Sequence, residues 1–530
     1  MSEFTEQTQV AAAGHMLERA RWASRSYSEF STADVNRIVR AVSEAAHDSA
    51  HKYAEWAVRE TTFGVVEHKV IKNQACSRGI VETYAEQDYV APRIDSHRKI
   101  IEVPRPAGVV LALTPSTNPV STVFFKVILA LMTRNAIVIS PHPMARQCCF
   151  DAAQMLAREA VAAGAPDGVV QCIAEPTIPL VESLMADERT NAILATGGTG
   201  VVRAAYSSGN PAMGVGPGNV PVLVDRTADI GNAAKRIIES KAFDNSTLCT
   251  NESVLIAEDA IADRLTRDLS HAGAAVLDAS AARQLAAYMF PGGRLNTQVV
   301  GKAAAWIARE AGIRIDPRAK VIVAPFEVAV PEEPFTHEKL SPVLGMVRVP
   351  SAQRGTQAAR AIVRIGGAGH SAAIHSTDPT TIMDYAARVP VLRVSVNVGN
   401  SAGSAGLSTN LAPSMTIGTG FVGRSSLGEN LEPQHLVNWT RIAYSSEPAE
   451  LMPDFTGKLP WKHVTGPVPP YPLASNDPSV PVPPVAAAAR NHTEGKVEPP
   501  TTSSEHDRFR EEVRRLVIAE LSELTKGYRG

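Results

Sequence analysis

Short apolar runs alternate with helical segments through the first part of the chain. The runs are GVVLALT, AIVIS, VVQCI and AILAT, at residues 108–114, 136–140, 169–173 and 192–196. Ahead of them, residues 30–85 show a helical pattern with a polar face, and Ser31 or Thr32 is available to cap its start. Strands that alternate with helices predict a parallel, doubly wound α/β sheet, in which ligands bind at the carboxyl ends of the strands.

A second alternating region runs from residue 233 to about 408. Its apolar runs are VLIAED, AKVIVAPF, SAAIHS and VSVNVG, and the helical segment AAKRIIESKAF leads into it. This pattern predicts a second α/β domain. Between the two regions lies a glycine-rich stretch, residues 195–221, around a short helical segment. Glycine lets backbone approach a dinucleotide closely, but the stretch does not match GxGxxG, and tight turns are an equally good interpretation.

The composition changes in the last 83 residues of the chain. Twelve of the 37 prolines lie between Pro453 and Pro500, with few large apolar residues, so we expect an extended, mobile linker over residues 448–502. Residues 503–530 then combine a capping box at Ser504 and Asp507 with an apolar stripe at helical spacing. The stripe consists of Phe509, Val513, Leu516, Val517, Leu521 and Leu524.

The terminal stripe needs a docking partner, because an isolated helix of about 20 residues is marginal in water. The segment from residue 503 onward carries six acidic residues and six Lys or Arg. A helix that lies on a membrane surface favours an excess of positive charge. We therefore expect the stripe to bind a groove on a protein.

The composition narrows the possible partners. The 530 residues are 44% hydrophobic, enough for two or more domains. The 52 basic and 54 acidic residues nearly balance, which favours small molecules over nucleic acid or an anionic membrane. Without a signal-peptide pattern or a run of about 18 apolar residues, we expect a soluble, cytoplasmic protein. The five cysteines show no CxxC spacing, so no metal site and no disulfide framework is predicted.

One cysteine has unusual neighbours. Cys249 lies in FDNSTLCTNES among small polar residues, whereas a buried structural cysteine normally lies among aliphatic ones. This setting predicts a partly solvated thiol that can act as a nucleophile. A small packed hydrophobe remains the alternative interpretation.

Seven motifs occur in order between residues 114 and 376: TPSTNPVSTVFFK, ISPHP, ATGGTG, AYSSGNPAMGVGPGNVP, FDNSTLCTNES, FTHEKLSPVLG and GHSAAIHS. Together they resemble the CoA-acylating aldehyde dehydrogenases, which include acetaldehyde and propionaldehyde dehydrogenases. The resemblance implies the aldehyde dehydrogenase fold: an NAD-binding Rossmann-like domain over residues 1–225, with oligomerisation strands near 95–105, a catalytic cysteine domain over 226–415, and a return to the cofactor and oligomerisation region over 416–447. It also implies a homodimer or homotetramer.

The resemblance implies that the protein oxidises a short-chain aldehyde, with NAD as cofactor and coenzyme A as the second substrate. Cys249 is expected to attack the aldehyde carbon and to remain as a thioacyl-enzyme after hydride leaves. The side-chain amide of Asn118 and the backbone N–H of Cys249 are expected to stabilise the oxyanion. The pair Asn118-Pro119 is equally typical of a helix N-cap, and the two interpretations can coexist.

One position distinguishes the chain from hydrolytic aldehyde dehydrogenases. Those enzymes carry a Glu-Leu-Gly-Gly motif whose glutamate activates the deacylating water, and here that position is Gly214. Without this base, the thioester is expected to react with the thiol of coenzyme A rather than with water. His370 matches a histidine implicated in acylating members, with an expected role in moving protons around either thiol. A packed or hydrogen-bonded histidine is the alternative.

The cofactor-binding residues follow from the same motifs. Glu338, in HEKLSPV, matches the glutamate that holds the hydroxyls of the nicotinamide ribose, although a lone glutamate is otherwise typical of a solvated surface. The other predicted cofactor-binding residues are Thr114, Pro115, Ser140, His142, Thr196, Gly197, Gly198 and Gly216.

The terminal segment resembles the targeting helices that family members carry, behind a flexible linker, in bacterial microcompartments. This implies an encapsulation peptide in residues 503–530 that binds a shell protein, a location in the compartment lumen, and a volatile substrate such as propionaldehyde. Oligomerisation through the helix or an unstructured extension are alternatives. Two other functions remain open: an acyl-phosphate reductase of the same fold, and a non-catalytic scaffold that organises a shell. Cys249, Asn118 and Glu338 argue against the scaffold.

Overall fold

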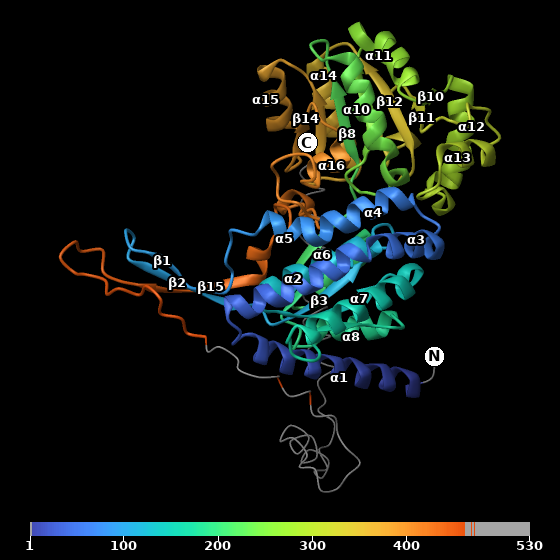
Figure 1. Cartoon of the computed structure of the whole chain (residues 1–530). Coiled ribbons are helices and arrows are strands. Elements are labelled where there is room, and N and C mark those ends of the chain that lie inside the picture. Colours follow the sequence, from blue (N-terminus) through green and yellow to red (C-terminus); the bar gives the residue numbers. More distant parts are fainter. Residues whose placement is uncertain (1–2, 462–467, 469–470, 472–530) are drawn as a thin grey trace, which may run out of the picture. The chain divides into compact units, whose positions relative to one another are not determined.

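Three β-sheets organise the chain in the computed structural model, which describes residues 3–461, 468 and 471 (Figure 1). The first sheet is parallel, with the order β5-β4-β3-β6-β7. Its strands are β3 (Val109–Thr114), β4 (Ala136–Pro141), β5 (Val170–Cys172), β6 (Ala192–Thr196) and β7 (Ala212–Val215). The second sheet is also parallel, with the order β10-β11-β12-β9-β8-β13-β14. Its strands are β8 (Val220–Val224), β9 (Glu252–Glu258), β10 (Ala274–Val276), β11 (Val321–Pro325), β12 (Val343–Val349), β13 (Ala372–His375) and β14 (Val394–Val396).

The predicted α/β fold is confirmed, because every apolar run quoted above from the two alternating regions forms a strand of one of these sheets. All residues of β3, β4 and β9 are buried. A parallel sheet covered on both faces requires such continuous apolar strands. The short runs therefore identify the central strands of both sheets.

Helices pack against the strands of the first sheet. α6 packs against β3 and β4, α7 against β4 and β5, and α9 against β6 and β7. The helices up to β7 are α1 (Glu3–Tyr27), α2 (Thr32–Asp48), α3 (Ala50–Thr61), α4 (Val66–Gln74), α5 (Ile80–Thr83), α6 (Pro119–Met132), α7 (Arg146–Ala162), α8 (Ile178–Ala186) and α9 (Thr199–Ser207). Ser31 caps α2, because its hydroxyl accepts the backbone N–H of Asp34 at 3.3 Å. A π-helical turn, Ala75–Gly79, joins α4 to α5.

The helices of the second sheet follow the predicted alternation. They are α10 (Ile230–Ala242), α11 (Asp259–His271), α12 (Ala279–Met289), α13 (Ala304–Glu310), α14 (Ala352–Ile365), α15 (Pro379–Arg388) and α16 (Asn400–Ser404). The helical segment expected ahead of Cys249 corresponds to α10, whose N-terminus is capped by Asp229. This helix leads directly into the segment that carries Cys249.

Helix α1 was not predicted from the apolar pattern. Its buried face consists of Ala13, Leu17, Ala20, Ala23 and Tyr27. Alanine is a strong helix former but contributes little apolar contrast, so this face gives a weak periodic signal. Contacts with α8 and β4 place the helix in the core of the first sheet.

The change from one sheet to the other comes earlier than predicted. The expected boundary lay at residue 225, but β8 already pairs with β9 and β13 of the second sheet. The chain therefore crosses between the sheets in residues 216–219, inside the glycine-rich stretch. The stretch contains the end of β6, all of β7 and the start of β8, which its small residues concealed.

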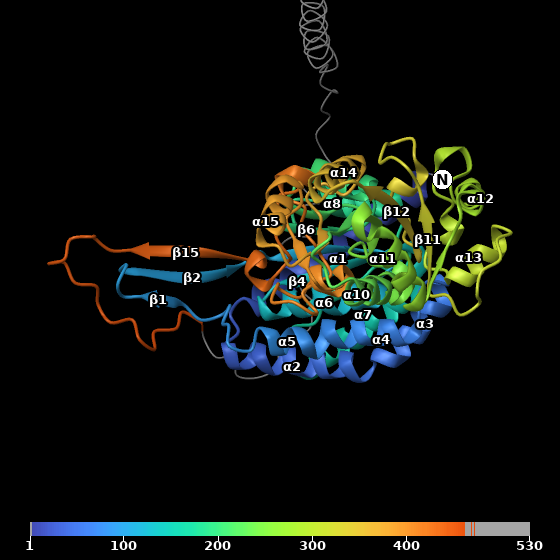
Figure 2. The same cartoon turned by 90° about the horizontal axis from the view of Figure 1, so that it is seen from above.

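A small antiparallel sheet completes the fold. Its strands are β1 (Arg93–Asp95), β2 (Ile100–Pro106) and β15 (Val437–Ala443), and Figure 2 shows them side by side. Strand β15 buries only its first residue fully, and Ile442 is 40% exposed. The sheet thus contributes little to the core that surrounds the two parallel sheets.

Residues 3–461, 468 and 471 contain neither a membrane-spanning helix nor a cluster of metal ligands. No helix in this part of the chain is long and apolar enough to cross a bilayer. The same residues contain no group of three or more His, Cys, Asp or Glu side chains placed to hold a metal ion. All five cysteines are free thiols.

The first part of the predicted linker is docked rather than mobile. The indole N–H of Trp461 donates to the carbonyl of Val90 at 2.7 Å, and the Arg134 guanidinium lies 4.1 Å from the Trp461 ring centroid. The ring of Tyr471 contacts that of Trp22 edge-on, with centroids 6.1 Å apart. The prediction of a mobile segment over all of 448–502 is wrong for Trp461 and Tyr471. It was based on the proline content and did not consider that these two aromatic side chains could anchor the segment. The rest of the linker and the predicted helix at 503–530 lie outside the described residues.

Trp461→Ala should lower the free energy of unfolding by about 2 kcal/mol, because it removes the indole donor and the ring over Arg134. Trp461→Phe retains a ring and is expected to lose about 1 kcal/mol, the contribution of one hydrogen bond. Urea denaturation of the three proteins measures both differences. Identical midpoints would contradict docking of this segment.

Candidate functional site

A cavity of about 810 Å³ lies where the carboxyl ends of β3, β4 and β6 face the turn before β9. In parallel α/β sheets, this edge is where ligands bind. The predicted site residues that line it are Thr114, Pro115, Asn118, Ser140, His142, Thr196, Gly197, Gly198, Gly216, Cys249 and Glu338. Residues more than 100 positions apart in the sequence are therefore brought to one cavity by both sheets.

The cavity wall has features that fit a dinucleotide. Gly198 precedes α9 and makes no side-chain cap, and a Cβ at Gly198 or Gly200 would meet no atom within 4 Å. The backbone N–H groups of this helix start are thus open to an anion such as a pyrophosphate. The hydroxyl of Thr114 is buried without a hydrogen-bond partner, and Ile178 is 75% exposed, so the wall also offers a polar contact and an apolar one.

Cys249 is half-buried in the turn that precedes β9, whereas the other four cysteines are buried. Two contacts hold the turn: the Leu248 N–H donates to the Asn251 side chain at 2.9 Å, and the Asn400 amide donates to the Thr250 carbonyl at 2.7 Å. Burial, reinforced by the Glu338 carboxylate, raises the pKa of the Cys249 thiol to about 12. The resting sulfur is therefore protonated, and its activation requires a base.

Gly218 is a site residue that the sequence analysis missed. A Cβ there would lie 2.1 Å from the carbonyl oxygen of Cys249 and 3.1 Å from the His370 ring, so no larger residue fits. Its N–H donates to the Glu338 carboxylate at 3.1 Å. Burial raises the pKa of Glu338 to about 8, so this glutamate is not the solvated surface charge that a lone residue would suggest. The GVGPGN segment contained the signal, but without indicating which glycine has a close neighbour.

His370 is fully buried and does not line the cavity. Its Nδ1 lies 3.0 Å from the Ser371 hydroxyl, while Nε2 has no hydrogen-bond partner. Burial, together with the charge of Arg393, lowers the pKa of His370 to about 3. The ring is therefore neutral at physiological pH and has one nitrogen available to accept a proton.

Asn118 occupies the N-cap position of α6, followed by Pro119, but its side chain does not cap the helix. Instead, the amide oxygen accepts from the Lys72 ammonium. The amide nitrogen donates to the Thr247 carbonyl and the Thr117 hydroxyl, both at 3.2 Å. The capping interpretation thus holds for the backbone position only, and one of the two amide N–H contacts reaches the segment that leads to Cys249.

Gly214 does not line the cavity. A Cβ at this position would lie 2.7 Å from Val202 and 2.8 Å from the Tyr206 ring. The Tyr206 hydroxyl accepts the Gly214 N–H at 2.8 Å. The space where a glutamate side chain would begin is therefore filled by two side chains of α9.

Comparison with known proteins places these features in a family. The model of the aldehyde dehydrogenase family matches residues 3–288. The chain is 36% identical over 446 residues to the bifunctional aldehyde-alcohol dehydrogenase of Escherichia coli (strain K12), covering 83% of this chain and 50% of that protein. It thus spans about half the length of that relative. It is 33% identical over 438 residues to the succinate-semialdehyde dehydrogenase (acetylating) of Clostridium kluyveri, covering 82% of this chain and 96% of that one.

Solved structures agree with this placement. An acetylating aldehyde dehydrogenase from Geobacillus thermoglucosidasius matches with a TM-score of 0.82 and 37% identity, over 85% of this chain and 99% of that one. The propionaldehyde dehydrogenase of the Clostridium phytofermentans fucose utilisation bacterial microcompartment matches with a TM-score of 0.75 and 27% identity, over 82% and 98% of the two chains. The Rhodopseudomonas palustris propionaldehyde dehydrogenase with bound CoA and an acylated cysteine matches with a TM-score of 0.73 and 28% identity, over 82% and 97%. The chain belongs to the aldehyde dehydrogenase family and is similar to its acylating members.

Proposed function

We propose that the protein oxidises a short-chain aldehyde to an acyl-CoA, with NAD as the electron acceptor and Cys249 as the nucleophile. The observation that carries this proposal is the position of Cys249. The thiol is half-buried and lines the same cavity as the N-terminal residues of α9, where no side chain caps the helix. A similar structure that holds CoA and an acylated cysteine supports the same assignment.

Activation of the thiol requires removal of its proton, because the pKa of Cys249 is raised to about 12. The Glu338 carboxyl, with a pKa of about 8, can accept a proton when it is ionised, whereas the pKa of about 3 makes His370 a weak base despite its free Nε2. Gly218 neighbours both: its N–H binds Glu338, and a Cβ on it would meet the His370 ring and the Cys249 carbonyl. We assign proton transfer at the sulfur to Glu338, which lines the cavity, with the neutral His370 ring as the weaker second acceptor.

Acylation then proceeds by addition of the Cys249 sulfur to the aldehyde carbon, which places a negative charge on the former carbonyl oxygen. The Asn118 amide and the backbone N–H of Cys249 donate to this oxygen. When bound, the dinucleotide supplies the acceptor for the hydride that leaves the same carbon. The α9 N-terminus, Thr114 and Glu338 are the groups that would hold it.

Deacylation regenerates the enzyme when the thiol of coenzyme A adds to the thioester and the Cys249 sulfur leaves. Hydrolysis competes with this step only if a base activates water in the cavity. The glutamate that hydrolytic members use for this purpose is replaced by Gly214, and Tyr206 and Val202 occupy the side-chain space at that position. We propose propionaldehyde as the substrate, since two of the similar structures are propionaldehyde dehydrogenases.

NADH formation from propionaldehyde and NAD should continue over many turnovers only when coenzyme A is present, with propionyl-CoA as the product. Cys249→Ala should abolish it, because no other cysteine lines the cavity among the described residues. Absorbance at the NADH band and product identification by mass spectrometry provide the measurement. Free acid formed at the same rate without coenzyme A would refute the acylating function, and phosphate-dependent turnover would identify an acyl-phosphate reductase.

Gly214→Glu should lower the free energy of unfolding by about 2–3 kcal/mol without conferring hydrolysis, because the new side chain overpacks against Tyr206. The matched pair Gly214→Ala and Gly216→Ala provides the control. A Cβ at Gly216 meets no atom within 4 Å, so only the Gly214 variant should be destabilised. Stable Gly214→Glu protein with rapid coenzyme A-independent turnover would show that space for a hydrolytic base exists.

We further propose that residues 503–530 bind a shell protein of a bacterial microcompartment, with propionaldehyde oxidation in its lumen. The apolar stripe of six residues and the balanced charge of the segment support a protein groove as partner. The similarity to an enzyme from a microcompartment supports the same proposal.

Deletion of residues 503–530 should leave coenzyme A-dependent turnover intact and abolish co-purification with shells produced in the same cell. Leu521→Glu, within the stripe, should have the effect of the deletion, while Glu520→Gln beside it should not. Quantitative blotting of purified shells measures the retained enzyme. Equal retention of the deleted and full-length chains would contradict the proposal.

A further inference from the structure

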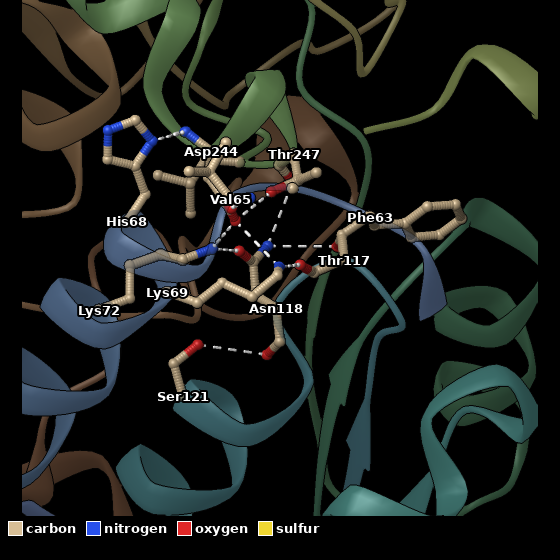
Figure 3. Close-up of polar contacts among 12 residues, drawn as sticks. Phe63, Val65, His68, Lys69, Lys72, Thr117, Asn118, Ser121, Asp244 and Thr247 are labelled. Atoms are coloured by element: carbon tan, nitrogen blue, oxygen red, sulfur yellow. Dashed lines mark hydrogen bonds and ion pairs between the residues drawn. The ribbon is translucent and has the colours of Figure 1, made fainter. Parts of the chain in front are cut away.

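Three buried charged residues lie directly beneath Asn118. Lys69 and Lys72 come from α4, and Asp244 comes from the segment between α10 and Cys249. The side chains of the three are at most 4% exposed. The Asp244 Oδ2 atom accepts from both ammonium groups, as Figure 3 shows. Burying such groups is costly, so an ion cluster of this kind is weak evidence for stability alone.

Lys72 determines which way the Asn118 amide points. An ammonium group carries three donors and no acceptor, so the Asn118 atom that it contacts has to be the amide oxygen. The NH₂ group therefore faces the opposite way, where it lies 3.2 Å from the Thr247 carbonyl (Figure 3). The Lys72 contact therefore leaves the NH₂ group as the donor end of the amide on the side of the segment that leads to Cys249.

The same cluster shapes the segment before Cys249. Asp244, Asn245 and Ser246 have φ values of 51°, 49° and 63°, three successive non-glycine residues in the left-handed region. Such backbone persists only where surrounding contacts hold it. The Asp244 carboxylate accepts from the Thr247 hydroxyl at 2.6 Å and from the Val65 N–H at 2.7 Å, in addition to the two lysines.

We propose that Lys72 is a positioning residue for the oxyanion site. By donating to Asp244 and to the Asn118 oxygen at once, its ammonium group fixes the amide donor relative to the segment that carries the nucleophile. Lys69 contacts Asp244 and the Thr117 carbonyl but has no bond to the Asn118 side chain. The role of Lys72 therefore acts through Asn118, and it rests on the proposed function of Asn118 in acylation.

The charge of Lys72 depends on the groups around it. These are the Asp244 carboxylate, the Lys69 ammonium, the His68 ring and the Cys76 thiol. Burial lowers the pKa of Lys72 to about 8, against the opposing effect of Asp244. As pH rises through this value, the ammonium loses its charge and its hold on the amide oxygen weakens. An arginine at this position would stay charged throughout.

A double-mutant cycle tests the proposal, with the rate of the NADH burst without coenzyme A as the readout. Lys72→Met should slow the burst about 10- to 100-fold and Asn118→Ala about 100-fold or more, as expected for loss of an oriented oxyanion donor. The double variant should be no slower than Asn118→Ala, because Lys72 acts only through that amide. NADH affinity, measured by fluorescence, should be unchanged in all four proteins. Losses that multiply would overturn the proposal.

Lys69→Met is the matched control, since it removes an equally buried ammonium from Asp244 without touching Asn118. Its effect on the burst should multiply with that of Asn118→Ala. Lys72→Arg should restore the burst rate that Lys72→Met loses. The ratio of the Lys72→Arg rate to the native rate should rise between about pH 7 and pH 9, because the native lysine loses its charge in this range while arginine does not. A ratio that stays constant with pH would indicate a merely structural role and overturn the proposal.

Urea denaturation of the same four proteins distinguishes this proposal from the proposed function. The midpoint shifts of Lys72→Met and Asn118→Ala should be non-additive if the two side chains are coupled, whatever reaction the protein catalyses. Additive shifts would refute the coupling itself. A native protein that forms NADH but releases free acid would instead refute the acylating function while leaving the cycle valid.

Discussion

The close approach of two backbone segments at Gly218 is the constraint on which the site depends. The chain leaves the first sheet at β7 and enters the second at β8, and the crossing segment runs directly against the Cys249 carbonyl. The contact leaves no room for a Cβ. Any larger residue would push the crossing segment away from the Cys249 carbonyl, so this glycine sets the spacing between the two sides of the cavity.

The low polarity around this crossing sets the resting state of the catalytic groups. The Cys249 thiol is protonated, His370 is neutral, and Glu338 titrates near neutral pH. All three shifts have burial as their main cause, because the charged form of each group loses hydration. The Cys249 thiol therefore keeps its proton at rest, and a nearby positive charge would lower its pKa.

Lys69, Lys72 and Asp244 form a cluster of buried ion pairs near these groups. Asp244 stays ionised because two ammonium groups and a hydroxyl surround it, and its pKa is lowered to about 2. The cluster connects α4, the start of α6 and the segment before Cys249, three parts of the chain that are far apart in sequence. The cluster thus holds the Asn118 amide in a fixed position relative to the segment that carries Cys249, and its three side chains do not line the cavity.

The sequence by itself determined the two parallel sheets and most of the site. Apolar runs such as residues 109–114 can be buried on both faces only as central strands, and the ordered motifs located Cys249, Asn118 and Glu338. Tertiary structure alone decided the rest. The alanine face of α1, the docking of Trp461 and the close contact of Gly218 depend on neighbours remote in the chain. Lys72 looks like a solvated helix residue, because only the fold places Asp244 and Asn118 beside it and makes its burial possible.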